Sequence, residues 1–446
     1  MMALRFDPAT ATREELLAVI AAQQATIAQL QERIATLERR LGSSGGKGMP
    51  GTKPAAATRS KAAGRPRKRR DRGYARARSL TPTHRVRHVL DQCPACATAL
   101  RGGWVSRRRE VIELPLAAVQ VVEYALISRR CPTCRRVVTP RLDLGDVVVG
   151  RQRFGVGLLS LIATLREVGR WPVQQIQWYL GTLHGLRLSV GAIVGACQQV
   201  AAAGQAALAE IRDRIRGSPV LHLDETGWRE DGVNGYVWTA STPTERLFVH
   251  GSRAGTMVDA IVGDAARGVL CCDGYAAYDH YPGRKQRCWA HVLRDLRDLR
   301  VAHPDAWALK RWAARLQRLY ADAVAFQHPD ARVRGQRQRR FEQRLTRLCQ
   351  RYADDPAAVQ GRLCRALLRH LPERFVFVAD PAVPPDNNAA ERSRRPLVTA
   401  RKISGGTRSP RGTATRMARA SLLGTARARG QDPLLACASL LTAGRL

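Results

Sequence analysis

The sequence contains few acidic residues. Its 446 residues include 37 Asp and Glu against 74 Lys and Arg, which gives a formal net charge of +37. A field of that sign favours polyanionic partners, and in a soluble protein the usual polyanion is nucleic acid. A basic protein of the membrane surface is the alternative, but it requires an amphipathic anchor or a lipid-facing run, and the sequence contains neither. We therefore expect a protein that contacts DNA or RNA.

Long apolar runs are also lacking. No apolar stretch reaches the roughly 20 residues that a membrane span needs. The N-terminus, "MMALRFDPATATREELL", does not have the basic-then-apolar layout of a secretory signal. We expect a cytoplasmic protein, and the eleven Cys in such a compartment are thiols or metal ligands rather than a disulfide framework. The length allows roughly three domains.

Residues 13–41 are predicted to form one helix with a heptad seam. Two apolar series, offset by three residues, repeat every seven positions: Ile20, Ile27, Ile34 and Leu41, and Leu16, Gln23, Leu30 and Leu37. Ile at a with Leu at d favours a parallel two-stranded coiled coil, and Gln23 is a polar interruption that can fix its register. The alternative is an amphipathic helix packed on its own domain. We expect self-association, because the segment that follows offers the helix no core to join.

Residues 42–78 are rich in Gly, Pro, Ser and Ala and then strongly basic, which is typical of a disordered linker. Within it, "GRPRKRR" resembles an AT-hook, a narrow extended strand that can place Arg65 and Arg67 in the minor groove. The alternative is a solvated basic linker that binds any phosphate.

Residues 79–148 contain two C-x2-C motifs, "CPAC" and "CPTC", separated by 34 residues. Four thiolates at this spacing suit tetrahedral zinc, and the apolar stretches between them predict the strands of a zinc ribbon. The predicted zinc ligands are Cys93, Cys96, Cys131 and Cys134. Two unrelated cysteine pairs and a redox role are the alternatives.

Residues 150–217 have a helical pattern. The stretch "WPVQQIQWYLGTLHGLRLSVGAIVGACQQV" predicts a helix, a turn near Gly185 to Ser189, and a second helix. That is the outline of a helix-turn-helix, and it predicts a DNA-binding region. Any helical hairpin gives a similar pattern, which is the alternative.

Residues 218–292 change to a strand pattern. "SPVLHLDETGW", "GYVWTAST" and "RLFVHGS" predict three strands, "AGTMVDAIVGDA" a helix, "GVLCCDGYAAY" a fourth strand, and "KQRCWAHVLRDL" a fifth strand turning into a helix. The order β-β-β-α-β is that of the ribonuclease-H-like fold. Central strands of such a sheet hold Asp224 and Asp273 side by side at their ends.

Two converging carboxylates repel each other unless cations lie between them, and Mg²⁺ prefers such oxygen ligands. A pair of ions can activate a water or a 3′-hydroxyl and stabilise the leaving oxygen in phosphodiester transfer. Glu391 is the predicted third carboxylate, one turn into a helix that Asp386, Asn387 or Asn388 can cap. The arginines beside it are suited to bind the phosphates that flank the reacting bond: Arg392, Arg394 and Arg395.

Each acid also has a simpler interpretation. An Asp that ends a strand commonly caps a turn, and Glu391 alone fits a helix-start acid favoured by the helix dipole. Glu225 is set aside as a ligand in place of Asp224, because adjacent residues on a strand face opposite ways. Asp279 ranks behind Asp273 because it falls after the strand.

Residues 293–378 are rich in Arg, Leu and Ala at helical spacing, which predicts a helical insertion that is basic toward DNA. Residues 379–446 complete the core and add C-terminal helices. Cys288 and His291, in "CWAH", do not make a metal site by themselves, and core packing of Cys288 and Trp289 is preferred. His291 is an accessory candidate near the reacting phosphate.

Four motifs, "LHLDET", "CDGYAAY", "CWAH" and "DNNAAERSRRP", occur here in that order. With them the chain resembles, over nearly its whole length, the insertion sequence 66 family transposases, bacterial DDE-type enzymes. The resemblance implies the triad Asp224, Asp273 and Glu391. It also implies cutting and rejoining of the element's double-stranded DNA ends with Mg²⁺ or Mn²⁺, and small accessory proteins as partners. The chain departs from the family after "RRPLVTARK", where it continues "ISGGTRSPRG" instead of an aromatic patch and "AGS".

The sequence therefore predicts an α/β multidomain protein. Its ribonuclease-H-like catalytic core carries a helical insertion and follows a coiled coil, a zinc ribbon and a helix-turn-helix-like region. A DNA transposase located in the bacterial cytoplasm, at the nucleoid when bound to DNA, is the leading hypothesis. A non-catalytic DNA-binding regulator derived from a transposase is the main alternative, and a structure-specific nuclease is the third.

Overall fold

The computed structural model describes Thr12 and residues 23–29, 31–32, 86–105, 119–150, 152–263 and 268–446. The predicted AT-hook-like segment, with Arg65 and Arg67, lies outside the described residues. Within the predicted coiled-coil segment, residues 23–29 and 31–32 are helical and exposed. The chain divides into two compact units, residues 1–113 and 114–446, and each is described by itself.

The two cysteine motifs lie in different units, and both form tight turns. In the second unit, β1 (Arg129–Arg130) and β2 (Val137–Val138) pair antiparallel on either side of the "CPTC" motif. Both strands are exposed. The first motif, "CPAC", is flanked by an isolated antiparallel bridge between Gln92 and Ala99.

The first helices of the second unit are α2 (Val156–Glu167), α3 (Val173–His184), α4 (Val190–Ala203) and α5 (Gln205–Arg216). Helix α3 ends at Gly185, whose φ of 66° is one that glycine adopts without strain. Helix α4 begins at Ser189, whose side chain accepts a hydrogen bond from the Ala192 amide. The predicted pair of helices with a turn over Gly185 to Ser189 is therefore present. No single helix among the described residues is long and apolar enough to cross a membrane, although α4 and α5, bent by 53°, meet the requirement together.

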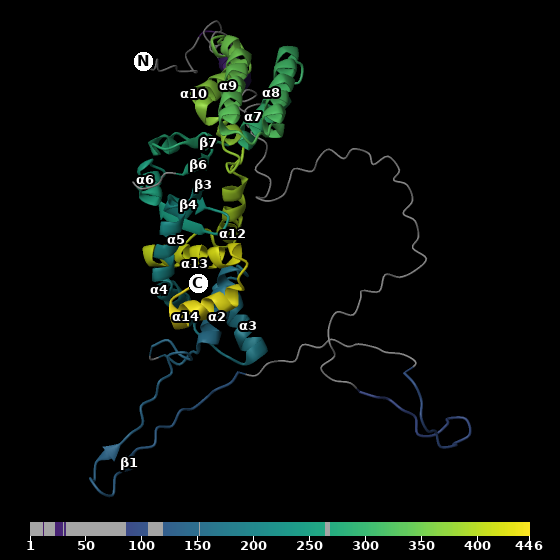
Figure 1. The fold of residues 1–446 in the computed structure, drawn as a ribbon, viewed down its shortest axis with the longest axis vertical. Helices are drawn as coiled ribbons and strands as arrows, with labels where there is room; N and C mark the ends of the chain where they lie inside the picture. Colours follow the sequence, from purple (N-terminus) through teal and green to yellow (C-terminus); the bar gives the residue numbers. More distant parts are fainter. Residues whose placement is uncertain are drawn as a thin grey trace. The chain divides into compact units, whose positions relative to one another are not determined.

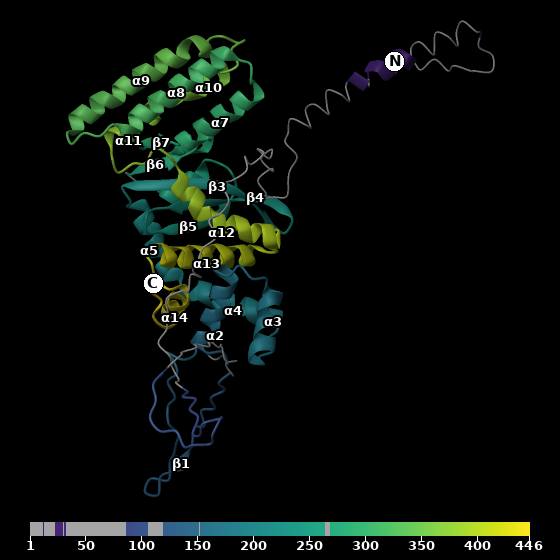
Figure 2. The same cartoon turned by 90° about the vertical axis from the view of Figure 1, so that its right-hand side faces the viewer.

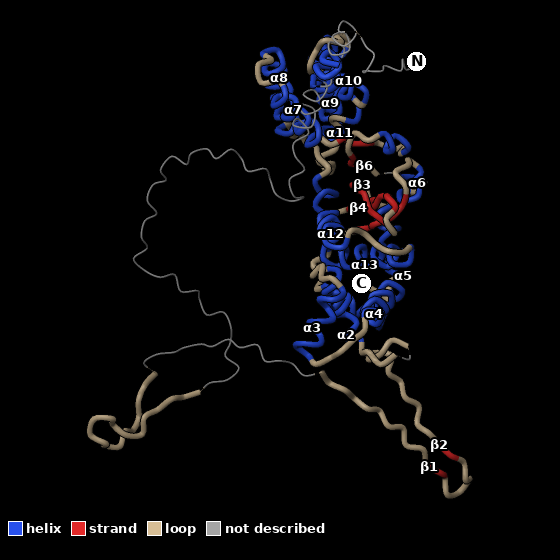
Figure 3. The backbone as a smooth tube through the Cα atoms, turned by 180° about the vertical axis from the view of Figure 1, so that it is seen from behind, coloured by secondary structure: helices blue, strands red, loops and turns tan. Residues whose placement is uncertain are grey.

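The described residues also form a five-stranded mixed sheet (Figure 3). Its strands are β3 (Val220–Glu230), β4 (Val233–Ser241), β5 (Arg246–Gly251), β6 (Val269–Cys272) and β7 (Lys285–Arg287), in the order β5-β4-β3-β6-β7. Strands β3, β4 and β5 pair antiparallel, whereas β6 runs parallel to both β3 and β7. Helix α6 (Thr256–Val262) connects β5 to β6, as the sequence predicted.

Strand β3 is longer than the sequence indicated. Its apolar run ends at Asp224, but the strand continues to Glu230, because residues 224–230 pair with β4 in a long hairpin. Its parallel pairing with β6 stops earlier, at His222 opposite Cys271. Asp224 therefore lies just beyond the point where β3 loses its neighbour on that side.

A helical layer with its own apolar core follows β7. It comprises α7 (Trp289–Ala302), α8 (Trp307–Ala325), α9 (Ala331–Ala353), α10 (Gly361–Arg369) and α11 (Val376–Ala379). Helix α9 is rich in Arg, but it buries four residues spaced four apart: Phe341, Leu345, Cys349 and Ala353. This spacing places the apolar residues on one face of the helix and leaves arginines on the other.

The chain then returns to the sheet. Helix α12 (Asn388–Ser404) lies alongside β3 and β4, and α13 (Pro410–Ala428) packs on β5 (Figure 2). Helix α14 (Pro433–Ala443) packs on α2 and α4, so the end of the chain joins its first helices (Figure 1). The sheet thus lies between the helical layer of α7 to α11 and the helices α13, α5 and α4.

Candidate functional site

The open edge of β3 determines where α12 lies. Alternate carbonyls of an extended strand point to the same edge of the sheet. Beyond His222, no residue of β6 pairs with this edge of β3. Hydrogen bonds from α12 and the loop after it satisfy these carbonyls in sequence. They run from Arg394 Nη1 to Glu225 O at 2.8 Å, from Arg401 Nη1 to Gly227 O, and from the Thr407 amide to Arg229 O at 2.9 Å. Helix α12 therefore replaces the missing strand.

Three carboxylates converge at this edge. Ligand oxygens of Asp224, Glu225 and Asp273 lie within 4.8 Å of one another. Asp224 and Glu225 are buried, while Asp273 is partly exposed in the turn after β6, where its Oδ1 accepts the Tyr275 amide at 2.8 Å. The structure thus places Asp224 and Asp273 close together, as the sequence predicted.

Asp224 is held in an unusual electrostatic environment. Its Oδ1 accepts from Arg394 Nη1 at 2.9 Å, whereas its buried Oδ2 has no hydrogen-bond partner among the described residues. Burial raises the pKa of Asp224 to about 7; Arg394 lowers it in part, and the neighbouring acids raise it further. A buried carboxylate oxygen without a partner is one that a cation can stabilise.

Glu225 belongs to this cluster, which corrects the sequence-based argument that set it aside. Alternation along a strand fixes the directions of the Cα–Cβ bonds, but the longer glutamate side chain still brings an oxygen to the cluster. Arg253 donates to Glu225 Oε1 from Nε at 3.1 Å and from Nη2 at 2.8 Å, and the Tyr278 hydroxyl donates to Oε2 at 2.6 Å. Burial, together with Glu225, raises the pKa of Tyr278 well above its usual value, so the phenol stays protonated and donates.

Glu391 lies in the first turn of α12, on the helix that closes the edge of β3. Its Oε1 is 3.8 Å from His291 Nε2 and 3.7 Å from Arg294 Nη2, both on α7. It is outside the group of acids whose ligand atoms lie within 4.8 Å, yet its charge contributes to the raised pKa of Asp224. The structure thus brings two of the three predicted acids together and places the third on the adjacent helix.

The residues before Glu391 tie α12 to the sheet. Asp386, one of the predicted capping residues, does cap, since its Oδ1 accepts the Asn388 amide at 3.0 Å. Asn387 makes no side-chain cap. It is buried and donates from Nδ2 to Leu223 O at 2.8 Å, and its Oδ1 lies 2.9 Å from His222 Nδ1. Asn387 therefore fixes the start of α12 beside the residue that precedes Asp224.

Cys288 and Trp289 are buried, in agreement with the core-packing interpretation. Cys288 Sγ also accepts the Asn387 amide at 3.1 Å, so it helps to place α12. Asp279, the second choice to Asp273, pairs instead with the fully buried Arg287. Arg287 further donates to the carbonyls of Asp273 and Tyr275, at 2.9 and 3.1 Å, and so fixes the turn that carries Asp273.

Four residues of the candidate site were missed by sequence reasoning: Arg253, Arg287, Arg294 and Tyr278. Of these, Tyr278 lies within "CDGYAAY", so its motif gave a signal. Among the predicted phosphate-binding arginines, Arg392 and Arg395 are exposed, whereas Arg394 forms an ion pair with Asp224.

The two cysteine turns have the same backbone geometry. The Cys93 amide donates to Thr98 O and the Ala97 amide to Cys93 O, and the Cys131 amide donates to Arg136 O and the Arg135 amide to Cys131 O. Ala97 and Arg135 both have positive φ, 56° and 55°. Hydrogen bonds from Thr98 lower the pKa of Cys96, and those from the Cys134 and Thr133 amides lower the pKa of Cys131. Each turn therefore favours a thiolate, the form that binds metal.

The family model of the IS66 family transposases matches residues 151–415, more than half of the chain. The chain belongs to the IS66 transposase family. The matched residues of this transposase run from α2 through the sheet and the helical layer into α13. No curated protein matches the sequence. Membership indicates transposase function, DNA as the partner and the use of divalent metal ions, for which the acidic cluster supplies ligands.

Proposed function

We propose that this transposase is a DDE-type enzyme that cleaves DNA at the ends of its element and joins them to a target. Its sheet, with the order β5-β4-β3-β6-β7, serves as a ribonuclease-H-like core. The observation that carries the proposal is the convergence of Asp224, Glu225 and Asp273 at the open edge of β3, in a chain of net charge +37. A non-catalytic DNA-binding regulator has no use for three converging carboxylates in so basic a protein.

The residues present fit Mg²⁺ or Mn²⁺. All the groups in the cluster offer carboxylate oxygens, which such ions prefer, and Asp224 Oδ2 is buried without a partner among the described residues. Asp224 and Asp273 would hold the ions, with Glu391 as the third ligand. When bound, divalent ions in such a site activate a water or a 3′-hydroxyl and stabilise the leaving oxygen.

The surrounding side chains position this machinery. Arg394 neutralises Asp224 and anchors α12 to β3 through two hydrogen bonds. Two basic residues of α7, His291 and Arg294, lie next to Glu391 and orient it. The exposed Arg392 and Arg395 are free to contact the phosphates that flank the reacting bond, as charged donors do.

The remaining parts of the chain organise the DNA. The heptad-patterned segment of residues 13–41 associates two copies of the chain, and the basic linker with Arg65 and Arg67 contacts the minor groove. Cys93, Cys96, Cys131 and Cys134 share one structural zinc ion, since both turns favour thiolates. Helices α3 and α4 contact the terminal repeats. Small accessory proteins act as further partners at the nucleoid.

Strand cleavage and strand transfer on DNA that carries the element's own terminal repeats test the proposal. With Mg²⁺ present, Asp224→Asn, Asp273→Asn and Glu391→Gln each abolish both reactions and leave DNA binding intact. Asp305→Asn, at an exposed acid of the helical layer, is the matched control and stays active. Strand transfer retained in all three active-site variants contradicts the assignment.

A further inference from the structure

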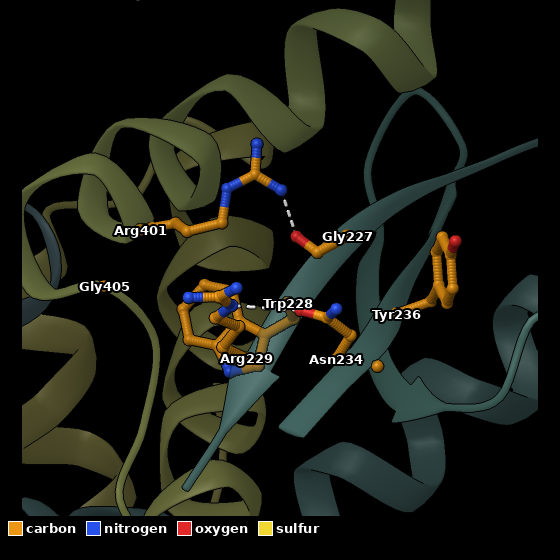
Figure 4. A pocket seen from close by; sticks show the side chains of 8 residues that line it. Gly227, Trp228, Arg229, Asn234, Tyr236, Arg401 and Gly405 are labelled. Carbon is orange, nitrogen blue, oxygen red and sulfur yellow. Dashed lines mark hydrogen bonds between the residues drawn. The ribbon is translucent and has the colours of Figure 1, made fainter. Parts of the chain in front are cut away.

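A cavity with basic and aromatic lining residues lies along the same β3 and α12 seam, beyond the acidic cluster. Its volume is about 360 Å³, within the range of roughly 300–1,000 Å³ of small-ligand sites. The described residues that line it come from β3, β4, α12 and the position just after α12: Gly227, Trp228, Arg229, Asn234, Gly235, Tyr236, Arg401 and Gly405. Figure 4 shows Arg401 reaching from α12 to Gly227, with Tyr236 and Asn234 projecting from β4.

The lining has the chemistry of a nucleotide site. None of the described lining residues is acidic, whereas Arg229 and Arg401 both supply guanidinium donors. Tyr236 offers an aromatic ring, which can stack on a base. Asn234 Oδ1 already accepts Arg229 Nε at 2.9 Å, so Asn234 holds Arg229 in place at the cavity. Gly227 leaves room for an occupant: a Cβ there meets only Arg401 Nη1, at 3.6 Å.

Arg253 and helix α12 each contact both the cavity and the acidic cluster. The Arg253 guanidinium lies over the Tyr236 ring, 5.3 Å from its centroid, and binds Glu225 of the cluster. Arg394 and Arg401 belong to one helix and bond to successive carbonyls of β3. Gly227 is three residues from Asp224, roughly 10 Å along a strand, which corresponds to about three stacked nucleotides.

We propose that this cavity binds one unstacked nucleotide of the DNA strand whose phosphodiester lies at the acidic cluster. Its base stacks on Tyr236. Its phosphate contacts the terminal guanidinium nitrogens of Arg229 and the Nη2 of Arg401, because Arg229 Nε is bonded to Asn234 and Arg401 Nη1 to Gly227 and Thr226. The proposal rests on the proposed function for the identity of the ligand. It adds a preference of the transposase for DNA with an unpaired nucleotide near the reacting end.

Binding measured without added Mg²⁺ or Mn²⁺ tests this site separately from catalysis. The probes are a fluorescein-labelled duplex with a short single-stranded end, which carries 2-aminopurine at one position, and the same duplex with a blunt end. We expect the full-length protein to bind the first duplex more tightly and to change the 2-aminopurine emission. Tyr236→Ala weakens binding to that duplex by roughly tenfold, as loss of base stacking does, and leaves the blunt duplex unaffected. Tyr236→Phe, which keeps the ring, behaves like the wild type.

Two further variants guard against a simple loss of folding. Arg229 is exposed at the end of the β3–β4 hairpin, so Arg229→Ala keeps the fold and lowers binding to the overhang duplex more than to the blunt one. Arg300→Ala, at an exposed arginine of α7, is the matched control for loss of one positive charge and lowers both equally. The proposal is overturned when Tyr236→Ala and Arg229→Ala leave the two affinities unchanged or lower both by the same factor. The two proposals fail in different assays. Loss of the overhang effects described above counts against this site, whereas strand transfer retained in the active-site variants counts against the proposed function.

Discussion

Replacing Asp224 by asparagine is predicted to stabilise the protein when no divalent ion is bound. Asp224 is 5% exposed, and one of its oxygens has no hydrogen-bond partner among the described residues. Burial is the largest cause of the pKa of about 7, against an ordinary value of 3.8. Asparagine has nearly the same shape and cannot ionise, so Asp224→Asn removes the buried negative charge while retaining the side chain.

The size of the effect follows from the linkage between protonation and folding. At 1.36 kcal/mol per pKa unit, a rise from 3.8 to about 7 corresponds to roughly 4 kcal/mol. Because the folded-state pKa is the higher one, the folded state binds the extra proton between these values, and stability falls as the pH rises from about 4 to about 7. The asparagine variant escapes this loss.

Urea unfolding over a pH series in the absence of Mg²⁺ and Mn²⁺ measures the difference. The free energy of unfolding of Asp224→Asn exceeds that of the wild type by little near pH 4 and by about 4 kcal/mol above pH 7. Asp305→Asn, at an exposed site, gives a difference that does not vary with pH. A pH-independent difference for Asp224→Asn, or a less stable variant at neutral pH, would refute the reasoning.

Three other predictions concern the neighbourhood of the site and the cysteine turns. Asn387→Ala leaves Leu223 O and His222 without their buried partner, so urea unfolding should show a loss of about 1–3 kcal/mol, and an unchanged midpoint contradicts that role. Mg²⁺ should raise the thermal midpoint of the wild type but not of Asp224→Asn, since a bound ion stabilises only the state that holds it; equal shifts argue against Asp224 as a ligand. Cys93→Ser combined with Cys131→Ser should lower zinc content by about one ion per chain, and unchanged content removes the zinc proposal.

Local patterns in the sequence were sufficient to predict the strands and helices of the sheet region. The apolar runs that end at Asp224 and Asp273 mark β3 and β6, and the helical spacing of the Arg-rich segment marks α8 and α9. These signals depend on residues close in the chain, where periodicity reports burial directly.

Contacts between distant segments could not be predicted in the same way. Nothing in the sequence around Arg394 shows that it pairs with Asp224, 170 residues earlier, or that α12 takes the place of a strand beside β3. The extension of β3 to Glu230 follows from pairing with β4 rather than from its own apolar pattern. Glu225 was misjudged because alternation describes where a side chain begins and not where its carboxylate ends.

The most direct test of the central claim is metal-dependent rescue at Asp273. A thiolate binds Mg²⁺ poorly and softer ions well, so Asp273→Cys changes which ion the site accepts. We predict that this variant, assayed for strand cleavage on the element's terminal repeats, is inactive with Mg²⁺ and recovers activity with Mn²⁺. Equal cleavage activity of Asp273→Cys with both ions would contradict a role for Asp273 as a ligand of the catalytic ions. So would an Asp273→Cys variant that is inactive with either ion while Asp273→Asn remains active.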